Sequence, residues 1–463
     1  MWDEATYANN SIDMLLNNKS IFVVEHLGKP DLYNTKPPLV IWLQALSMKA
    51  LGINEFAIRL PSALAGLLTV LLVYGFCVRV LKSKTIGFIS ALILLSAKGY
   101  ISNHIVRTGD LDAVLVFWLM LGLFTSIDLL VKKPKNVQIH FLILSLSITC
   151  GFLTKGIAGL FFVPSMFLSM CLFGNHRLFK EKSLYTAAFS ALFICASYYV
   201  IREFESPGYL KIVLESEVFR FNQVVMSWHV HPFDYYFQNL KNTRFSPFFY
   251  ILPIAILNFF ILKTQKLYTF VYLMIAAIGY FGIISYPAVK LEWYDAPLFP
   301  LLSILIGLSF VEAGTFMFNK LSNSWDVMWI KSILAVTAML FLLKPIKAIL
   351  EIVKYPEEQI YSMDFDGAYL KHLKRNRPDI KNLTVFKIEA HEEHYDQILF
   401  YIRAYEHQYD YDITLTQELN FKKDEIVMIC KPSDKEALKK HYIIKEIDSW
   451  LEGTLFLIKD KRS

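Results

Sequence analysis

The chain has 463 residues, of which 55% are hydrophobic, 15% aromatic and only 19% charged. A soluble protein of this length is excluded by so apolar a composition, and the chain is expected to reside in a lipid bilayer. The net charge is only +6, and the basic residues form short clusters between apolar runs. Because no continuous basic surface is expected, a nucleic-acid partner is not predicted.

Candidate membrane spans are runs of about 20 apolar residues. About ten such runs occur, at 60–80, 86–101, 112–131, 137–153, 157–173, 184–201, 247–262, 268–286, 294–313 and 328–348. Thr154, Lys155 and Gly156 interrupt what is otherwise one overlong run between 137 and 173. This interruption predicts two helices joined by a tight turn, with Lys155 at a membrane surface.

The orientation follows from the short connections, because Lys and Arg are enriched on the cytoplasmic side of membranes. Alternate connections contain basic residues, which are Lys82, Lys84, Lys132, Lys133, Lys135, His176, Arg177, Lys180, Lys182, Lys263, Lys266 and Lys320. With these connections in the cytoplasm, the opposite face receives the segment before 59, the stretch 102–110, the Lys155 turn, the loops 202–246 and 287–293, and the tail after 349. Most of the remaining polar residues are therefore expected outside the cytoplasm.

Two domains are predicted. Residues 1–349 form a membrane domain with a first outer segment at 1–58, and residues 350–463 form a small soluble extracytoplasmic α/β domain. In the second domain, strand-like runs at 383–386 and 426–429 alternate with helix-like stretches at 396–407 and 433–441. The orientation places Trp2 outside the cytoplasm, yet no spanning helix precedes it, so we expect that a first spanning helix is missing from this sequence.

The first outer segment contains a carboxylate pair, Asp3 and Glu4, and a lysine, Lys36, followed by Pro37 and Pro38. A carboxylate pair can act as a general base or bind a cation, and a fixed lysine can hold a phosphate. The alternative is that the charges are solvated and the prolines simply begin a helix. Composition alone does not decide between the two.

The stretch 107–112 places Asp110 and Asp112 at the mouth of a predicted span. Asp110 can be explained as a helix cap, because a helix N-terminus stabilises negative charge. Asp112 falls in the first helical turn near the bilayer, where ionisable groups are costly and tend to be functional. Lys155 is either an anchor that reaches the headgroups or a functional cation.

Later outer loops add further polar side chains, namely Glu217, Arg220, His229, His231, Arg244, Lys290, Glu292 and Tyr294. Basic groups from several loops on one face suit a substrate whose phosphate lies in the headgroup plane. The alternating His229 and His231 have no clear carboxylate partner, so they are a weak indication of a metal site. The need for a metal is left open.

Several different short motifs lie along the membrane domain. They are Asp3-Glu4-Ala5-x-Tyr7, Lys36-Pro37-Pro38-Leu39 with Trp42-Leu43-Gln44, Asn54-Glu55-Phe56-x-x-Arg59-Leu60-Pro61-Ser62, Arg107-Thr108-Gly109-Asp110-x-Asp112, Gly151-Phe152-Leu153-Thr154-Lys155-Gly156, Glu217-x-x-Arg220-Phe221 and Lys290-x-x-x-Tyr294-x-x-Pro297. Together they resemble the polyprenyl-phosphate-dependent glycosyltransferases of the GT-C superfamily, in particular lipid A aminoarabinose transferases and protein O-mannosyltransferases.

The resemblance implies a helical polytopic membrane fold and an inverting sugar transfer from undecaprenyl phosphate. The acceptor is expected to be lipid A, another glycolipid, a polysaccharide or a protein at the periplasmic face of a bacterial inner membrane. Asp3 is expected to be the general base beside Glu4, and Lys36 is expected to hold the donor phosphate. Arg220 and Lys290 are expected to support that lysine, and a divalent cation is an optional cofactor. The resemblance assigns substrate binding to Arg59, Arg107, Asp110, Asp112, Lys155, Glu217 and Tyr294.

One departure from the family pattern concerns Thr35, because relatives often have an acidic residue immediately before the lysine of the Lys-Pro-Pro segment. Two other functions stay open. A lipid or polysaccharide transporter predicts polar residues in mid-membrane, of which the candidate spans have few. A non-catalytic member of the fold is the third alternative.

Overall fold

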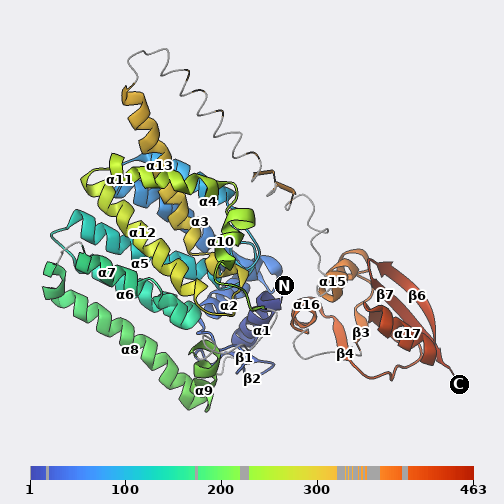
Figure 1. Ribbon diagram of the computed structural model, residues 1–463. Helices are drawn as coiled ribbons and strands as arrows, with labels where there is room; N and C mark the ends of the chain where they lie inside the picture. The colour runs from blue at the N-terminus through green and yellow to red at the C-terminus, as the bar shows by residue number, and fades with distance from the viewer. Residues whose placement is uncertain are drawn as a thin grey trace.

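The computed structural model describes residues 2–16, 20–172, 176–218, 229–320, 365–387 and 395–462, together with isolated residues between 329 and 351. Within these ranges, six helices are long and apolar enough to cross a membrane. They are α3 (Glu55–Arg79), α5 (Asp112–Lys132), α6 (Gln138–Lys155), α8 (Lys182–Glu205), α12 (Thr264–Ser285) and α13 (Leu298–Lys320). Figure 1 shows them gathered in one bundle, in which α5 is buried along most of its length. The chain is thus a multi-pass membrane protein.

Two predicted spans are shorter in the structure. The run at 86–101 becomes α4 (Lys84–Ser96), which begins at the N-cap Ser83 and ends where Ala97 turns to extended backbone. Its 13 residues rise about 20 Å, which is less than the roughly 30 Å of bilayer hydrocarbon. The run at 157–173 becomes the 3-10 turn η1 (Gly156–Leu160) and the ten-residue helix α7 (Val163–Leu172).

The run at 247–262 forms η7 (Phe248–Leu257) and α11 (Asn258–Ile261). Before them lie α10 (Tyr235–Asn239) and η6 (Leu240–Arg244). The helical segments Tyr235–Arg244 and Phe248–Ile261 meet at a bend of 118°, and together they form a seventh span if they cross the membrane as one broken helix. The predicted span at 328–348 lies almost entirely outside the described residues. A 3-10 turn, η2 (His176–Lys180), connects α7 to α8.

One face of the bundle, called the outer face below, is built from the described elements between residues 2 and 51 and from short elements of later loops. The first segment contributes α1 (Trp2–Leu16), a hairpin of β1 (Glu25–His26) and β2 (Lys29–Pro30), and α2 (Leu39–Leu51). The later elements are α9 (Tyr209–Val213), η3 (Leu214–Val218) and η8 (Glu292–Asp295). Asn10 of α1 is fully buried and donates hydrogen bonds to Asp31 and to the carbonyl of Glu25, so α1 fastens the hairpin.

A small α/β domain follows, as the sequence predicted. Its sheet has the order β4-β3-β5-β7-β6, in which β3 (Asn382–Phe386) runs parallel to β4 (Asp412–Thr416) and β5 (Ile426–Ile429). The strand β7 (Gly453–Lys461) is antiparallel to both β5 and β6 (Tyr442–Trp450). The helices are α15 (Phe365–Asn376), α16 (Asp396–Tyr409) and α17 (Pro432–His441).

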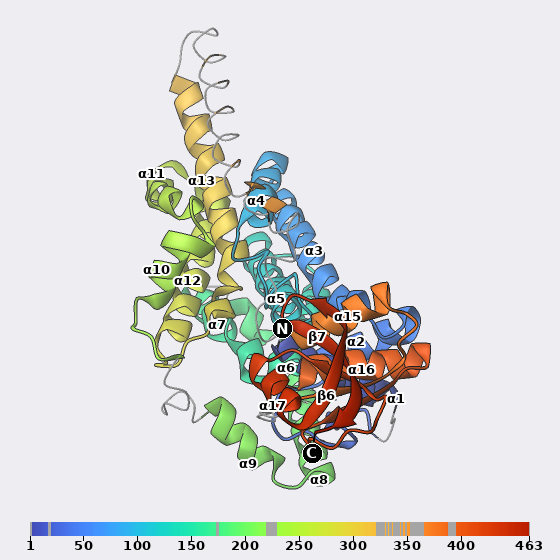
Figure 2. The same cartoon turned by 90° about the vertical axis from the view of Figure 1, so that its right-hand side faces the viewer.

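The α/β domain packs on the outer segment of the membrane domain, with α16 beside α1 (Figures 1 and 2). Ala8 and Ile12 of α1 share one hydrophobic core with Ile398 of α16. Arg403 of α16 donates to Asp13 of α1 at 2.7 Å, and both side chains are largely shielded from solvent. The position of α1 therefore depends on contacts with the C-terminal domain.

We predict that Arg403→Ala destabilises the protein by about 3 kcal/mol, because it leaves the buried Asp13 carboxylate without its charged partner. Lys459→Ala is the matched control, because Lys459 forms an ion pair on the surface. Its Nζ atom lies 3.9 Å from Oδ1 of Asp424, and both side chains are exposed. The control is expected to change stability by less than about 1 kcal/mol. Melting temperatures of the two purified variants in detergent check the difference, and equal values would contradict a buried ion pair between the domains.

Candidate functional site

Glu4 ties three segments of the outer face together. Its carboxylate accepts two hydrogen bonds from Arg59 of α3, at 2.6 and 2.9 Å, and a third from the backbone N–H of Gly109, at 2.7 Å. The side chain is only 4% exposed. These three hydrogen bonds connect α1 to α3 and to the loop before α5.

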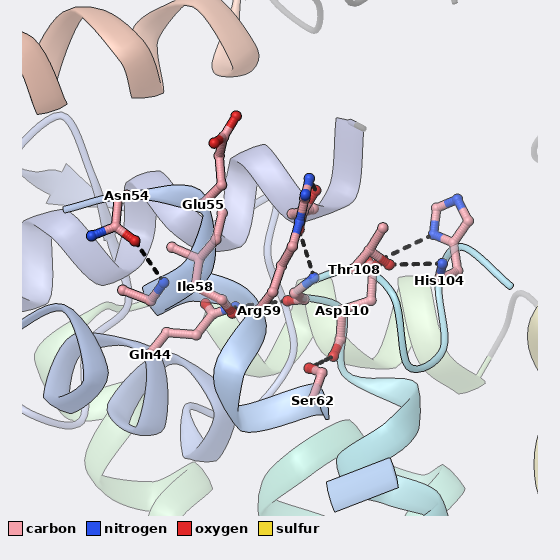
Figure 3. Close-up of polar contacts among 12 residues, drawn as sticks. Gln44, Asn54, Glu55, Ile58, Arg59, Ser62, His104, Thr108 and Asp110 are labelled. Carbon is pink, nitrogen blue, oxygen red and sulfur yellow. Dashed lines mark hydrogen bonds and ion pairs between the residues drawn. The ribbon is translucent and has the colours of Figure 1, made fainter. Parts of the chain in front are cut away.

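The loop before α5 is held by motif residues of α2 and α3 (Figure 3). Gln44 donates to the carbonyl oxygens of Gly109 and Ile58, at 2.7 and 3.0 Å, and Ser62 donates to the carbonyl of Asp110 at 2.8 Å. A side chain on Gly109 would meet the backbone of Ile58 at 2.8 Å, so the close approach requires glycine. These motif residues thus shape the loop that presents Asp110.

Asp3, His104 and Asp110 meet at this loop. The Nδ1 atom of His104 lies 3.5 Å from Asp110 Oδ2 and 3.9 Å from Asp3 Oδ2. Thr108 donates to Asp110 and accepts from the backbone N–H of His104 (Figure 3). One carboxylate oxygen of Asp3, one of Asp110 and one ring nitrogen of His104 all lie within 4.8 Å of one another. The three side chains are therefore close enough to bind a single metal ion.

The charges in this group influence one another. Partial burial and the negative charge of Asp110 raise the pKa of the Asp3 carboxyl above its usual range, which suits a general base near neutral pH. Burial acts to raise the pKa of Asp110, but the stronger combined effect of His104 and Thr108 lowers it. Burial acts to lower the pKa of His104, and Asp110 and Asp3 outweigh that effect and raise it. The group therefore contains one carboxyl that is poised to accept a proton and one that stays ionised.

A second charged group lies where α6 ends. Lys155 is buried and its Nζ atom lies 2.7 and 2.8 Å from the two carboxylate oxygens of Asp112. It also lies 4.9 Å from the ring centre of Tyr294. Gly156 follows with a φ of +57°, a conformation that favours glycine and that ends the helix where the sequence predicted. Lys155 is thus an internal cation instead of a headgroup anchor.

A third charged group surrounds Lys36. Its Nζ atom contacts Glu217, which also accepts a hydrogen bond from Thr35 at 3.0 Å. Burial acts to raise the pKa of Glu217, but the charge of Lys36 lowers it overall, so the ion pair persists at neutral pH. Glu217, from a distant loop, thus provides a carboxylate beside Thr35.

The segment before Lys36 is held by two residues that the sequence analysis did not select. Arg202 of α8 is fully buried and donates to the carbonyl oxygens of Val24 and Asp31. Tyr209 donates to the carbonyl of Thr35 at 2.8 Å. Arg202 directly follows the predicted span at 184–201, whereas Tyr209 has no such sequence signal. His104 was also missed, although it lies in the selected stretch 102–110.

A cavity connects the second and third charged groups. Its polar wall contains Lys36, Asp112, Lys155, Ser216, Glu217 and Tyr294. Its apolar wall is formed by α5, by η1 with the residue after it, and by α12 with the loop after it. The apolar residues are Leu115, Ile157, Ala158, Phe161, Ile283, Ile284 and Val289. Such a cavity suits a ligand with an anionic head and a hydrocarbon chain.

Other predicted site residues have different surroundings. Lys290 is buried and donates to the backbone carbonyls of His231 and Pro287, so it fastens its own loop. Arg244 forms a buried pair with Asp295 at 2.7 Å, and His231 stacks on Tyr235. Arg107 is half-buried beside Arg59 and has no ion-pair partner within the described residues. Arg220 lies outside the described residues.

Comparison with known proteins gives a consistent set of matches. Residues 35–200 match the family model described as dolichyl-phosphate-mannose-protein mannosyltransferase. The undecaprenyl phosphate-α-4-amino-4-deoxy-L-arabinose arabinosyl transferase of Wigglesworthia glossinidia brevipalpis is 32% identical over 174 residues, which is 37% of this chain and 30% of that protein. An uncharacterised protein of Aquifex aeolicus is 24% identical over 73% of this chain and 64% of its own length. The chain thus spans less than two thirds of each of these curated relatives.

Solved structures share the fold. The chain superposes on ArnT from Cupriavidus metallidurans bound to undecaprenyl phosphate with a TM-score of 0.69, at 15% identity, over 98% of this chain and 93% of that one. The archaeal oligosaccharyltransferase AglB from Archaeoglobus fulgidus gives a TM-score of 0.53, at 15% identity, over 86% of this chain and 59% of that one. The chain therefore shares the fold of these solved membrane proteins, and its residues 35–200 match the mannosyltransferase family model.

Proposed function

We propose that this protein transfers a sugar from an undecaprenyl-phosphate donor to an envelope acceptor, with inversion at the sugar carbon. The observation that carries the proposal is the cavity with two kinds of wall, which has Lys36 and Lys155 at its polar end and an apolar path between α5 and α12. A polyprenyl chain fits the apolar path, and its phosphate fits the cationic end. The named relative from Wigglesworthia and the ArnT neighbour support this donor class.

The reaction needs a base on one side of the sugar and a cation on the other. The acceptor hydroxyl oxygen attacks the sugar carbon, its proton passes to Asp3, and the bond from that carbon to the phosphate oxygen breaks. Negative charge then builds on the departing phosphate, where Lys36 stabilises it. Asp3 is 44% exposed and has a raised pKa, so it is the accessible carboxyl of the pair. Glu4 serves as a positioning residue, because its oxygens are bonded to Arg59 and Gly109.

The proposed active face is the one that carries α1, η3 and η8, and we place it on the periplasmic side of a bacterial inner membrane. The distribution of basic residues supports this orientation, because Lys132 and Arg79 gather around Asp128 at the far end of α5. The acceptor is lipid A, another glycolipid, a polysaccharide or a protein. Arg59, Arg107 and Tyr294 are proposed to contact substrate.

We predict that Asp3→Asn and Lys36→Ala each lower the transfer rate by about 100-fold or more, because one removes the base and the other the cation for the leaving phosphate. The assay uses radiolabelled sugars from a panel of undecaprenyl-phosphate donors with envelope extract as acceptor. Asp234→Asn is the control for the carboxylate and Lys49→Ala is the control for the lysine. Both side chains are exposed, and Lys49 lies on α2. Transfer that both site variants retain would refute the assignment, and absence of transfer with every donor would favour a transporter or a non-catalytic protein.

The C-terminal domain is proposed to hold α1 in place. Asp396 accepts hydrogen bonds from Thr6 and Asn9 of α1, two turns or less from Asp3. The alternative is that this domain presents the acceptor, in which case deletion of 360–463 affects transfer to the native acceptor only.

We predict that Asp396→Ala lowers kcat about tenfold with every acceptor and leaves the acceptor KM unchanged, because a displaced α1 misplaces the base. Asp424→Asn is the control, since Asp424 is an exposed carboxylate of the same domain. Steady-state kinetics with two acceptors check the prediction. A raised acceptor KM with an unchanged kcat would instead indicate that the domain presents the acceptor.

A further inference from the structure

Helix α15 of the α/β domain carries three basic side chains on one face. Lys374 and Arg375 follow Lys371 by three and four residues, a spacing that places them together on the surface of a helix. The buried Leu370 and Leu373 of α15 pack into the core between the domains. We propose that the basic face of α15 binds the anionic headgroups of phospholipids in the leaflet that surrounds the start of α3.

The length of α3 fixes the level of α15 relative to the bilayer. The helix has 25 residues and therefore rises about 37 Å, which exceeds the roughly 30 Å of bilayer hydrocarbon. Its first residue, Glu55, therefore lies in the headgroup layer. The Nζ atom of Lys371 is 2.8 Å from both carboxylate oxygens of Glu55. This ion pair places α15 in the headgroup layer as well.

The surface beside this ion pair is apolar and continues the lipid-facing side of α3. Phe56, which follows Glu55, is 65% exposed. It shares one side of α3 with the exposed Leu64 and Leu67, because these residues are spaced by nearly whole helical turns. Exposed apolar surface of this kind marks contact with a membrane. Lipid therefore surrounds α3 up to the residue that Lys371 contacts.

The end of α16 adds an aromatic ring at the same level. Gln408 donates to the backbone carbonyl of Ile53 at 2.6 Å, so the end of α16 meets the turn between α2 and α3. The next residue, Tyr409, is exposed, and the Nζ atom of Lys374 lies 3.2 Å from its ring centre. Tyrosine and lysine are typical of membrane–water interfaces, because each joins an apolar body to a polar end. The pair thus has the composition of a headgroup contact.

The protein leaves most of the positive charge of this face uncompensated. Lys371 remains 59% exposed although it is paired with Glu55. Within the described part of the chain, Lys374 contacts tyrosine rings and neither it nor Arg375 has a carboxylate partner. An anionic lipid phosphate supplies the missing negative charge. Each basic residue close to an anionic membrane raises the affinity about fivefold.

The test compares the purified full chain in nanodiscs of phosphatidylcholine with the same chain in nanodiscs that contain phosphatidylglycerol. Hydrogen–deuterium exchange of the α15 amides is the readout, because a ligand on the folded helix slows its opening by mass action. With phosphatidylglycerol, exchange is expected to be about tenfold slower or more. The double variant Lys374→Ala with Arg375→Ala is expected to exchange at nearly equal rates in the two lipids.

Lys439→Ala with Lys440→Ala is the control, because both lysines are exposed on α17 of the same domain. The control is expected to retain the slower exchange, and so is Lys374→Arg with Arg375→Lys, which preserves the charge. Melting temperatures in detergent show that each variant is folded. Equal rates for the parent in the two lipids, or slowing that survives in the folded double alanine variant, would overturn the proposal. The same slowing by inorganic phosphate in phosphatidylcholine would also overturn it, because the ligand would then be a free anion.

Discussion

The bidentate pair of Glu4 and Arg59, with the N–H of Gly109 as a third donor, is the contact on which the outer face depends. It joins a helix that begins at residue 2, a helix that begins at residue 55 and a loop near residue 109. Charge-assisted hydrogen bonds of this geometry are strong and directional, and the carboxylate is almost fully shielded. The separation of Asp3 from Asp110 is thereby set, and so is the environment of both carboxylates.

Two further ion pairs let the site hold cations near the bilayer before any substrate arrives. The buried Lys155 is paired with Asp112 and the partly exposed Lys36 with Glu217, so the charge of each cation is compensated. An unpaired charge there would be costly, and a solvated one would be weakened by water. A phosphate that enters the cavity meets cations that are already oriented, which is the condition under which electrostatic stabilisation of a leaving group is most effective.

The C-terminal domain packs against α1 and helps to fix its position. Here α16 supplies an apolar contact through Ile398 and charged contacts through Asp396 and Arg403. A domain that lies far away in sequence thus supports the helix that bears the candidate base.

Local sequence determined the features that depend on neighbouring residues alone. Within the described residues, six of the predicted apolar runs form helices long enough to cross a bilayer, where backbone groups must be satisfied internally. Gly156 ends α6 as predicted, since its backbone adopts a conformation that other residues disfavour. Two strands of the α/β domain, β3 and β5, likewise lie where the sequence predicted them.

Only the tertiary structure decided which charges meet. Asp3 and Glu4 are adjacent, yet successive residues of a helix point about 100° apart, so one faces His104 and the other Arg59. The partner of Lys36 lies 181 residues away, and its neighbourhood includes Arg202 and Tyr209, which no local pattern marks. Such pairings arise from the packing of whole helices. A sequence pattern therefore indicated where polar chemistry gathers on this protein, and the packing decided which side chains are free to perform it.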